Sequence, residues 1–368
     1  MLKRIYIDNF RCLVNFELAV DPINLFLGPN GAGKSAIFDA LRTVQMFVTS
    51  ANQAGTIFHS TDFTRWQTSS EQRFELELDG NGGTYRYELA ITYAQHRDLK
   101  QAQVKHERLW CNNDPVLRFE SGNVQLYHDD GTPGQQFAFA TGQSVLAVQP
   151  SQPEHTRLSW FKARMERFII VAIDPIIMTG QSSREESQPS PNMENFASWY
   201  RYIYQDQSKA MAITTALQEV LDGFSHIKLE MAGQQHRFLK LCFLQDSKNS
   251  LNFELEELSD GERVLIALYT MLHYARSEDY TLCIDEPENF LALPEIQPWL
   301  TLLYDLCSDN ELQALLISHH PELINYLASS AGYWFQRESS APARVQRITA
   351  DDNGVPMAEL IARGWLHA

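Results

Sequence analysis

The segment Gly28-Pro-Asn-Gly-Ala-Gly-Lys-Ser35 decides the fold of this chain. It fits G-x-x-x-x-G-K-[ST], in which glycines let backbone N–H groups surround phosphate oxygens, the lysine reaches the β- and γ-phosphates, and the serine binds Mg²⁺. Residues 23–27 are a short apolar run typical of a buried strand, and residues 35–47 carry apolar side chains at helical spacing. A strand, a glycine-rich loop and a helix N-terminus form an anion site. The predicted nucleotide-binding residues are Asn30, Gly31, Ala32, Gly33, Lys34 and Ser35.

Three further motifs follow this loop along the chain. They are Leu258-Ser-Asp-Gly-Glu-Arg263, Thr281-Leu-Cys-Ile-Asp-Glu286 and Ser318-His-His320. The alternative for residues 28–35 alone is a chance glycine-rich turn. The flanking strand and helix, together with the later motifs, argue against that alternative.

The second of these motifs ends in carboxylates. The apolar run Leu282-Cys-Ile284 leads into Asp285-Glu-Pro-Glu288. An aspartate at the carboxyl end of a strand is placed to hold Mg²⁺, and a following glutamate to polarise the attacking water. Taken alone, this segment is more typical of a solvated turn, and the phosphate-binding loop upstream is what favours catalysis. We therefore predict Ser35 and Asp285 as Mg²⁺ ligands and Glu286 as the catalytic base.

The segment Leu258–Arg263 resembles the Leu-Ser-Gly-Gly-Gln signature of ABC-type ATPases. The resemblance implies that Ser259 and the backbone of Gly261 bind the γ-phosphate of an ATP molecule held on a second subunit. Two acidic replacements make the segment more acidic than the family pattern, and Arg263 can offset that charge. The alternative is a plain helix N-cap, since Ser259 with a glutamate three residues later opens a helix well. The two interpretations are compatible.

A histidine pair follows another apolar run, Leu312-Gln-Ala-Leu-Leu-Ile317, in the sequence Ser318-His-His-Pro321. In ABC-type ATPases a switch histidine after such a strand contacts the γ-phosphate. Its place in the Thr/Ser-His-x-Pro pattern implies that His319 has this catalytic role. The alternative is that either histidine caps the helix predicted to start at Pro321.

The N-terminal segment Leu2-Lys-Arg-Ile-Tyr-Ile-Asp-Asn-Phe-Arg11 resembles the opening strand of the RecF, SMC and OLD (overcoming lysogenization defect) branch of these ATPases. The resemblance implies that Arg11 touches the nucleotide, while Cys12 stands where that branch has serine. It also implies an α/β P-loop NTPase head, with a mixed central sheet and an antiparallel β layer. The resemblance covers about residues 1–95 and 195–368. Residues 96–194 are predicted to form an inserted accessory β/helical cap with a flexible loop at 181–192.

Two informative patterns lie in or before the predicted cap region. Residues 74–89 alternate around Asp79-Gly-Asn-Gly-Gly83, which predicts a β-hairpin at the edge of this region. Residues 157–168 interleave basic and aromatic side chains, which is one pattern of a nucleic-acid-binding face. Leu158, Phe161, Met165 and Phe168 nevertheless fall at helical spacing. The favoured interpretation is a core-facing stripe with Lys162, Arg164 and Arg167 on a solvated face.

Composition restricts the class of protein. The formal net charge of −16 disfavours broad adhesion to DNA, although a local basic face remains allowed. No run of 18 apolar residues is present, so we expect no membrane span and a cytoplasmic location. The five scattered cysteines predict reduced core residues rather than disulfides or a zinc framework.

These observations predict an ATPase that binds ATP and Mg²⁺ and forms a head-to-tail homodimer when ATP is bound. Fewer than fifty residues follow His320, too few for the nuclease often fused to OLD-type ATPases. The resemblance therefore implies a separately encoded effector, a nuclease or toxin, in anti-phage defence. The alternative is a RecF-like DNA repair ATPase that binds DNA directly. A transporter subunit is disfavoured because the signature lies over two hundred residues beyond the P-loop.

Overall fold

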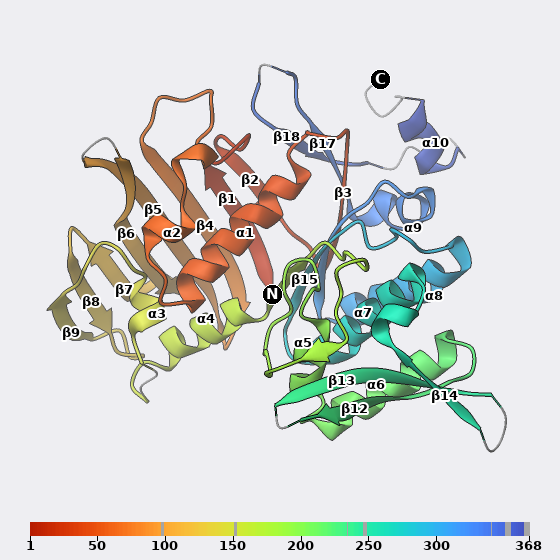
Figure 1. The fold of residues 1–368 in the computed structure, drawn as a ribbon. Helices are drawn as coiled ribbons and strands as arrows, with labels where there is room; N and C mark the ends of the chain where they lie inside the picture. The colour runs from red at the N-terminus through yellow and green to blue at the C-terminus, as the bar shows by residue number, and fades with distance from the viewer. Residues whose placement is uncertain are drawn as a thin grey trace. The chain divides into compact units, whose positions relative to one another are not determined.

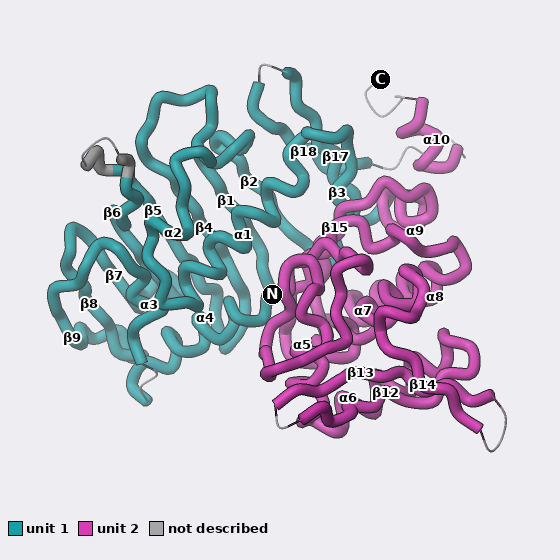
Figure 2. The backbone as a smooth tube through the Cα atoms, in the orientation of Figure 1, with its two compact units in different colours: residues 1–168, 330–350 teal, residues 169–329, 351–368 magenta. Residues whose placement is uncertain are grey.

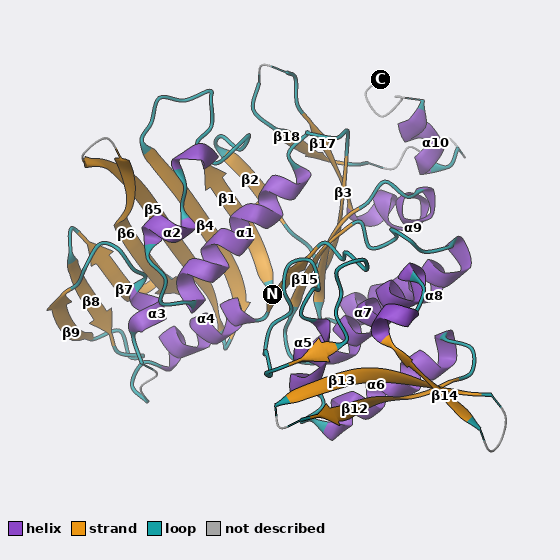
Figure 3. Ribbon diagram, in the orientation of Figure 1, coloured by secondary structure: helices purple, strands orange, loops and turns teal. Residues whose placement is uncertain are grey.

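The computed structural model describes residues 1–96, 99–150, 153–233, 235–245, 249–339, 341–349 and 355–363. The chain divides into two compact units (Figure 2). Unit 1 comprises residues 1–168 and 330–350, and unit 2 comprises residues 169–329 and 351–368. Both units mix helices and strands (Figure 3).

Unit 1 is built on an antiparallel sheet in the order β2-β1-β4-β5-β6-β7-β8-β9 (Figure 1). Its strands are β1 (Leu2–Asp8), β2 (Phe16–Ala19), β4 (Glu71–Gly80), β5 (Gly83–His96), β6 (Leu99–Cys111), β7 (Asp114–Glu120), β8 (Asn123–Tyr127) and β9 (Pro133–Ala138). The hairpin predicted around residues 79–83 is confirmed, because β4 and β5 pair up to Gly80 and Gly83. Positive φ at Asn81 and Gly82 provides the tight turn that joins them.

The two faces of this sheet differ in polarity. In β4, Phe74, Leu76 and Leu78 are buried, while the alternate residues on the other face are partly exposed. Helices cover the apolar face (Figure 1). They are α1 (Lys34–Thr49), α2 (Ala54–Ile57), α3 (Val145–Val148) and α4 (Thr156–Glu166), with the 3₁₀ turn η1 (Ser60–Asp62) following α2.

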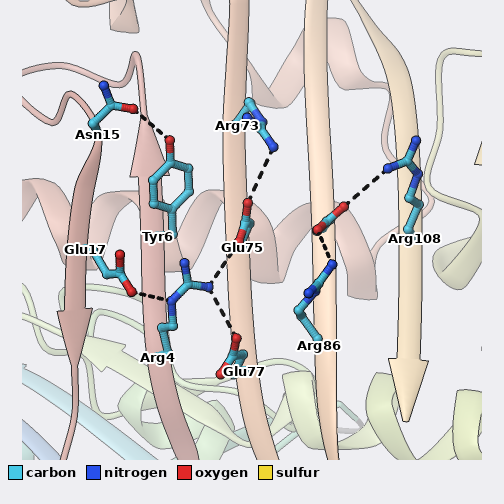
Figure 4. A network of polar contacts seen from close by, with 10 residues as sticks. Arg4, Tyr6, Asn15, Glu17, Arg73, Glu75, Glu77, Arg86 and Arg108 are labelled. Carbon is cyan, nitrogen blue, oxygen red and sulfur yellow. Dashed lines mark hydrogen bonds and ion pairs between the residues drawn. The ribbon is translucent and has the colours of Figure 1, made fainter. Parts of the chain in front are cut away.

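Ion pairs cross the polar face of the sheet from strand to strand (Figure 4). Arg4 in β1 contacts Glu17 at 2.6 Å, Glu75 at 3.0 Å and Glu77 at 3.3 Å. Further along the sheet, Arg86 and Arg108 both reach Glu88. Opposite charges on adjacent strands favour this register over one with like charges opposed.

The helix predicted from residues 157–168 is largely confirmed as α4, and its apolar stripe packs into unit 1. Phe161 stacks on Tyr87 with ring centroids 5.2 Å apart, and Trp160 lies 4.3 Å from Tyr85. The prediction of a solvated Arg164 was wrong. Its side chain is fully buried, with the guanidinium 4.8 Å from the centre of the Phe168 ring. Helix α4 ends at Glu166, so the chain bends there and Phe168 starts a strand instead.

Unit 1 also contains the strands that hold the glycine-rich loop. The predicted strand at residues 23–27 is β3 (Ile23–Leu27), and it pairs in parallel with β17 (Gly332–Gln336). Strand β18 (Arg344–Arg347) pairs antiparallel with β17. Two segments more than 300 residues apart in the sequence are therefore paired as neighbouring strands.

Unit 2 contains a second group of strands with helices around them. Strand β15 (Thr281–Asp285) lies between β10 (Phe168–Val171) and β16 (Gln313–Ile317), and it is parallel to β16. A separate antiparallel sheet contains β11 (Gln181–Ser182), β12 (Phe224–Ala232), β13 (His236–Leu244) and β14 (Ser250–Glu254). The helices are α5 (Phe196–Ile203), α6 (Gln207–Val220), α7 (Asp260–Ala275), α8 (Leu293–Ser308), α9 (Pro321–Ala331) and α10 (Met357–Ala362), with the 3₁₀ turn η2 (Leu255–Glu257) before α7.

The compact units have other boundaries than the domains predicted from the sequence, whose division at residues 95 and 194 stays a prediction. The sheet of unit 1 includes β6, β7, β8 and β9, and the chain passes into unit 2 after Phe168. The segment 181–192 is mostly irregular, as its composition predicts. It is nevertheless held by hydrogen bonds, since Asn195 donates to Glu186 and to the carbonyl of Gln188.

Two expectations from composition concern the whole chain. All five cysteines are free and buried, which confirms their prediction as core residues. Among the residues that the structure describes, no helix is long and apolar enough to cross a bilayer.

A buried carboxyl group lies inside unit 1. Glu107 in β6 accepts hydrogen bonds from the hydroxyls of Ser144 and Tyr87 and from the backbone N–H of Val145. Burial raises its pKa to about 7 from the usual 4.5, although these three hydrogen bonds oppose the shift. The folded chain therefore keeps this proton at pH values where the unfolded chain has lost it.

We predict that Glu107 makes the free energy of unfolding fall as pH rises from about 4.5 to about 7, by roughly 3 kcal/mol if the pKa shift is fully expressed. The sign follows because the folded state binds more protons than the unfolded state in this range. Glu107→Gln cannot ionise and should lose this part of the pH dependence. Urea unfolding of both proteins at pH 5 and pH 8 measures the difference. Identical pH dependence in the two would contradict the prediction.

Candidate nucleotide site

The glycine-rich loop adopts a backbone that only glycine tolerates well. Gly28 and Gly33 have φ values of 135° and 108°. A Cβ atom on Gly28 would lie 2.1 Å from the carbonyl oxygen of Phe335 in β17, and one on Gly33 would lie 2.8 Å from the sulfur of Cys12. The glycines therefore allow the loop to turn sharply between β3 and α1 while neighbouring backbone approaches it.

The start of α1 has the features of an anion site. Gly33 occupies the N-cap position, so no side chain caps the helix, and its first turn carries no acidic residue. The Lys34 side chain is buried, and its ammonium donates to the carbonyl oxygens of Gly28 at 2.7 Å and Pro29 at 3.2 Å. Ser35 and Asn30 are exposed, whereas Ala32 is buried. Backbone N–H groups, a helix N-terminus and a cation within one loop suit a polyphosphate.

Arg11 lies beside this helix in unit 1. Its guanidinium forms ion pairs with Asp39 in α1 and with Asp62, which is 3.3 Å away. Arg11 itself has a positive φ of 50°, and its backbone N–H donates to the carbonyl of Asp62. The side chain is about half exposed. Arg11 is thus held at the P-loop helix, and its contact with a nucleotide stays a prediction.

Two residues near the loop were missed by the sequence analysis. An amino group of Arg337 lies 4.0 Å from where a Cβ on Gly31 would be, and its guanidinium lies 5.8 Å from the centre of the Trp66 ring. Both side chains lie at least partly open to solvent. Nothing in their local sequence suggests a nucleotide, because only the fold of unit 1 brings residues 31, 66 and 337 together.

The acidic strand end lies in unit 2, and its backbone is fixed by the neighbouring strand. Glu286 has a positive φ of 51°, and its N–H donates to the carbonyl of Ile317 at the end of β16. Its carboxylate accepts from the side-chain amide of Asn289 at 2.8 Å and is partly exposed. Asp285 is the last residue of β15 and is also partly exposed. Both predicted carboxylates thus lie at the carboxyl end of a parallel strand pair, as expected.

Glu288 has a different position. Its side chain is buried and accepts from the Ser318 hydroxyl at 2.6 Å and from the His319 backbone N–H at 3.2 Å. It therefore fixes the turn after β16. His319 itself is exposed, whereas the Nδ1 atom of His320 accepts from the backbone N–H of Glu322 at the start of α9. Of the two histidines, His320 is the one that caps the helix.

The signature segment opens α7 with a capping box. Ser259 is the N-cap, its hydroxyl accepts from the N–H of Glu262, and the Glu262 carboxylate accepts from the N–H of Ser259. Ser259 is exposed. A Cβ on Gly261 would lie 2.9 Å from the carbonyl oxygen of Phe290, so glycine allows this helix start to approach the turn after the acidic strand. The capping interpretation is confirmed, and the γ-phosphate interpretation stays a prediction.

Arg263 is engaged in holding the same segment. Its guanidinium donates to the carbonyl oxygens of Pro175 at 2.6 Å and Leu258 at 2.9 Å, and it lies 3.5 Å from Asp260. The contact with Asp260 agrees with the prediction that Arg263 offsets the charge of the acidic replacements, and the two carbonyl contacts add a structural role. Arg263 ties the start of α7 to the loop after β10.

The predicted site residues are divided between the two units. Unit 1 carries Arg11 and the loop with Lys34 and Ser35, and unit 2 carries Ser259, Gly261, Asp285, Glu286 and His319. Within unit 2, the Glu288 side chain contacts the histidine turn and the Phe290 backbone lies close to the signature helix, so the turn after the acidic strand is next to both.

Comparisons with known proteins agree with these observations. The chain is 48% identical over 345 residues to an OLD nuclease of Thermus scotoductus, an alignment that covers 87% of this chain and 59% of that protein. The chain thus spans about three fifths of the length of this relative.

Solved structures of SMC heads share the fold. An SMC head bound to the C-winged helix domain of ScpA is 11% identical, with a TM-score of 0.57 over 94% of this chain and 97% of that one. The SMC head domain from Thermotoga maritima is 13% identical, with a TM-score of 0.50 over 95% of this chain and 99% of that one. At these identities the likeness concerns the fold alone.

The predicted fold class is confirmed by this likeness, since the chain is a P-loop ATPase head with mixed α/β structure and an antiparallel sheet. The sequence pattern of the AAA domain family matches residues 4–315, which is most of the chain. The chain therefore belongs to the AAA domain family and carries an ATP-binding domain of the AAA type.

Proposed function

We propose that this protein hydrolyses ATP with Mg²⁺ and that it does so in a head-to-tail dimer. The observation that supports this most directly is the conformation of the 28–35 loop, in which left-handed glycines and the buried Lys34 surround an uncapped helix start. In this proposal the backbone N–H groups and Lys34 bind the β- and γ-phosphates. The hydroxyl of Ser35 and the carboxylate of Asp285 hold Mg²⁺, which lowers the charge repulsion during phosphoryl transfer.

Glu286 is the proposed base. Its carboxylate is partly exposed and oriented by Asn289, so it can accept a proton from a water molecule. Glu288 is a weaker candidate because its Oε1 atom is engaged by Ser318 and His319. The exposed His319, on the turn that Glu288 fixes, is proposed to contact the γ-phosphate.

The second subunit enters through the signature segment. Ser259 lies exposed at the N-terminus of a 16-residue helix, where the helix dipole favours an anion. We propose that this helix start closes over the γ-phosphate bound to the loop of a second copy. Each site would then need residues from two chains, which makes dimerisation depend on ATP.

The biological role proposed is anti-phage defence, with ATP-driven dimerisation controlling a separate effector. Similarity to the OLD nuclease supports this proposal. The alignment covers only 59% of that relative, so its nuclease activity is not assigned to this chain. A net charge of −16 disfavours a function that depends on broad DNA adhesion, and it is compatible with a protein effector.

We predict that Glu286→Gln lowers ATP turnover by about 10²- to 10⁴-fold while ATP binding is retained. The amide keeps the shape of the side chain but cannot accept the proton. Steady-state phosphate release and calorimetric ATP binding measure the two effects. Glu288→Gln is the matched comparison, because it keeps an oxygen acceptor for Ser318, and it should lose much less activity. The opposite ranking of the two variants would identify Glu288 as the base.

The shared site is tested by mixing two inactive variants. Lys34→Ala should lose ATP binding, and Ser259→Arg should bind ATP without closing over it. In a mixed dimer one site collects both lesions and the other collects neither. Random pairing makes about half of the dimers mixed, so the mixture should recover up to about a quarter of wild-type turnover if the sites are independent.

A control separates the two roles of Ser259. Ser259→Asp keeps an acceptor at the N-cap but adds negative charge where the γ-phosphate is proposed to bind. It should fold with normal thermal stability and remain inactive. Full turnover in Ser259→Asp or in Ser259→Arg alone would refute the shared site.

A further inference from the structure

A cluster of two histidines and a glutamate lies in unit 1, outside the residues proposed to handle ATP. His128 follows β8 at the turn into β9, and Glu154 and His155 lie immediately before α4. One ligand atom from each of these three side chains lies within 4.8 Å of the other two. The histidine rings are nearly parallel, with an interplanar angle of 6° and centroids 5.4 Å apart.

The surroundings of His155 orient its imidazole as in a metal-binding histidine. The side chain is only 1% exposed, and its Nδ1 atom lies 3.0 Å from the carbonyl oxygen of Tyr127. A carbonyl only accepts, so Nδ1 carries the proton and Nε2 carries the lone pair. That Nε2 atom is buried and has no hydrogen-bond partner among the residues that the structure describes. A histidine whose Nδ1–H donates to a backbone carbonyl is the usual arrangement of a metal-binding imidazole.

Capping of α4 does not explain why a histidine side chain is buried at position 155. Although His155 is the N-cap residue of α4, its side chain makes no capping hydrogen bond. The cap is supplied by Asp129, whose carboxylate accepts from the backbone N–H groups of Thr156 at 2.9 Å and Arg157 at 3.1 Å. The same contacts hold the turn after β8 against the start of α4. His128 lies in this turn, and its ring is thereby stacked next to that of His155.

The turn itself leaves room for His128. The backbone N–H of His128 donates to the carbonyl of Thr132, and the N–H of Gly131 donates to the carbonyl of His128. A Cβ on Gly134 would lie 3.3 Å from Nε2 of His128, closer than most such contacts. Glycine at this position therefore lets the imidazole lie against β9.

We propose that His128, Glu154 and His155 bind a Zn²⁺ ion. Two imidazoles and one carboxylate are a donor set that zinc prefers, with a fourth position left for water. Tetrahedral zinc needs ligand atoms about 3.3 Å apart, given zinc–nitrogen distances of roughly 2.0–2.1 Å. The exposed Glu154 and the partly exposed His128 can close the remaining gap by side-chain rotation.

Such an ion would join the β8–β9 turn to the start of α4. That helix packs on β5 through Trp160 and Phe161. At its other end, the carbonyl of Met165 accepts from Gln45, a residue of the P-loop helix α1. Zinc would therefore stabilise a helix that supports the nucleotide-binding loop without touching the nucleotide.

The test is zinc binding by the full chain, without nucleotide, after removal of metals with a chelator. Competition with a chromophoric chelator should show one tight Zn²⁺ per chain, and Zn²⁺ should raise the melting temperature by a few degrees. Co²⁺ in place of Zn²⁺ should give the visible absorption of a tetrahedral site.

Two variants change side chains that are partly or fully exposed, so the chain should still fold. A loss of zinc binding in them can then be assigned to the lost ligand. His128→Asn and Glu154→Gln should each weaken zinc binding by about a hundredfold or more and abolish the thermal shift, with unchanged near-UV circular dichroism. His226→Asn, an exposed histidine on β12, is the matched control and should bind zinc like the wild type. Absence of tight zinc binding, or equal affinity in His128→Asn, would overturn the proposal.

Discussion

The close approach of Gly28 to the backbone of β17 is the constraint on which the proposed ATP chemistry depends. A Cβ at this position would lie 2.1 Å from a carbonyl oxygen, so any other residue would push the loop away from the strand. The loop instead leaves β3 in a left-handed turn and enters α1 without a side-chain cap. A helix start without a side-chain cap can bind phosphate through its backbone N–H groups, which is the physical basis of the proposed site.

The acidic strand end in unit 2 is ordered by a comparable set of short-range contacts. Glu288 holds the turn that carries His319, and Gly261 lets the signature helix approach the backbone of Phe290. The main-chain bond from Glu286 to Ile317 fixes the direction of the carboxylate proposed as the base. A substitution in any one of these motifs would therefore shift residues in the other two. Such coupling suits residues that are proposed to act on the same phosphate.

The buried charged and polar side chains of unit 1 have different roles, some structural and one proposed to be functional. Arg164 is buried against the Phe168 ring and Glu107 is buried among three hydrogen-bond donors, so both belong to the core. His155 is equally buried, but one of its ring nitrogens has no hydrogen-bond partner within the described part of the chain. Burial of a lone pair without a donor is costly, and this supports a metal ligand at His155. A guanidinium such as that of Arg164 has only donors and no lone pair to offer a metal, and the Glu107 carboxyl group already accepts three hydrogen bonds.

The sequence by itself determined the elements and motifs, because local patterns carry that information. The apolar run of β3, the glycines of the loop and the helical spacing of α1 follow from backbone stereochemistry and amphipathic periodicity. The capping box at Ser259 could also be predicted from the sequence.

Only the tertiary structure decided which charged side chains are buried and which residues distant in the sequence come into contact. Arg164 lies three residues after Phe161, on the buried face of α4, and it was its charge rather than its spacing that suggested a solvated position. Arg337 reaches the loop only because β17 pairs with β3, and His128 reaches His155 only because Asp129 caps α4. Contacts of this kind depend on strand pairing and packing across many residues, for which a single sequence contains no local signal.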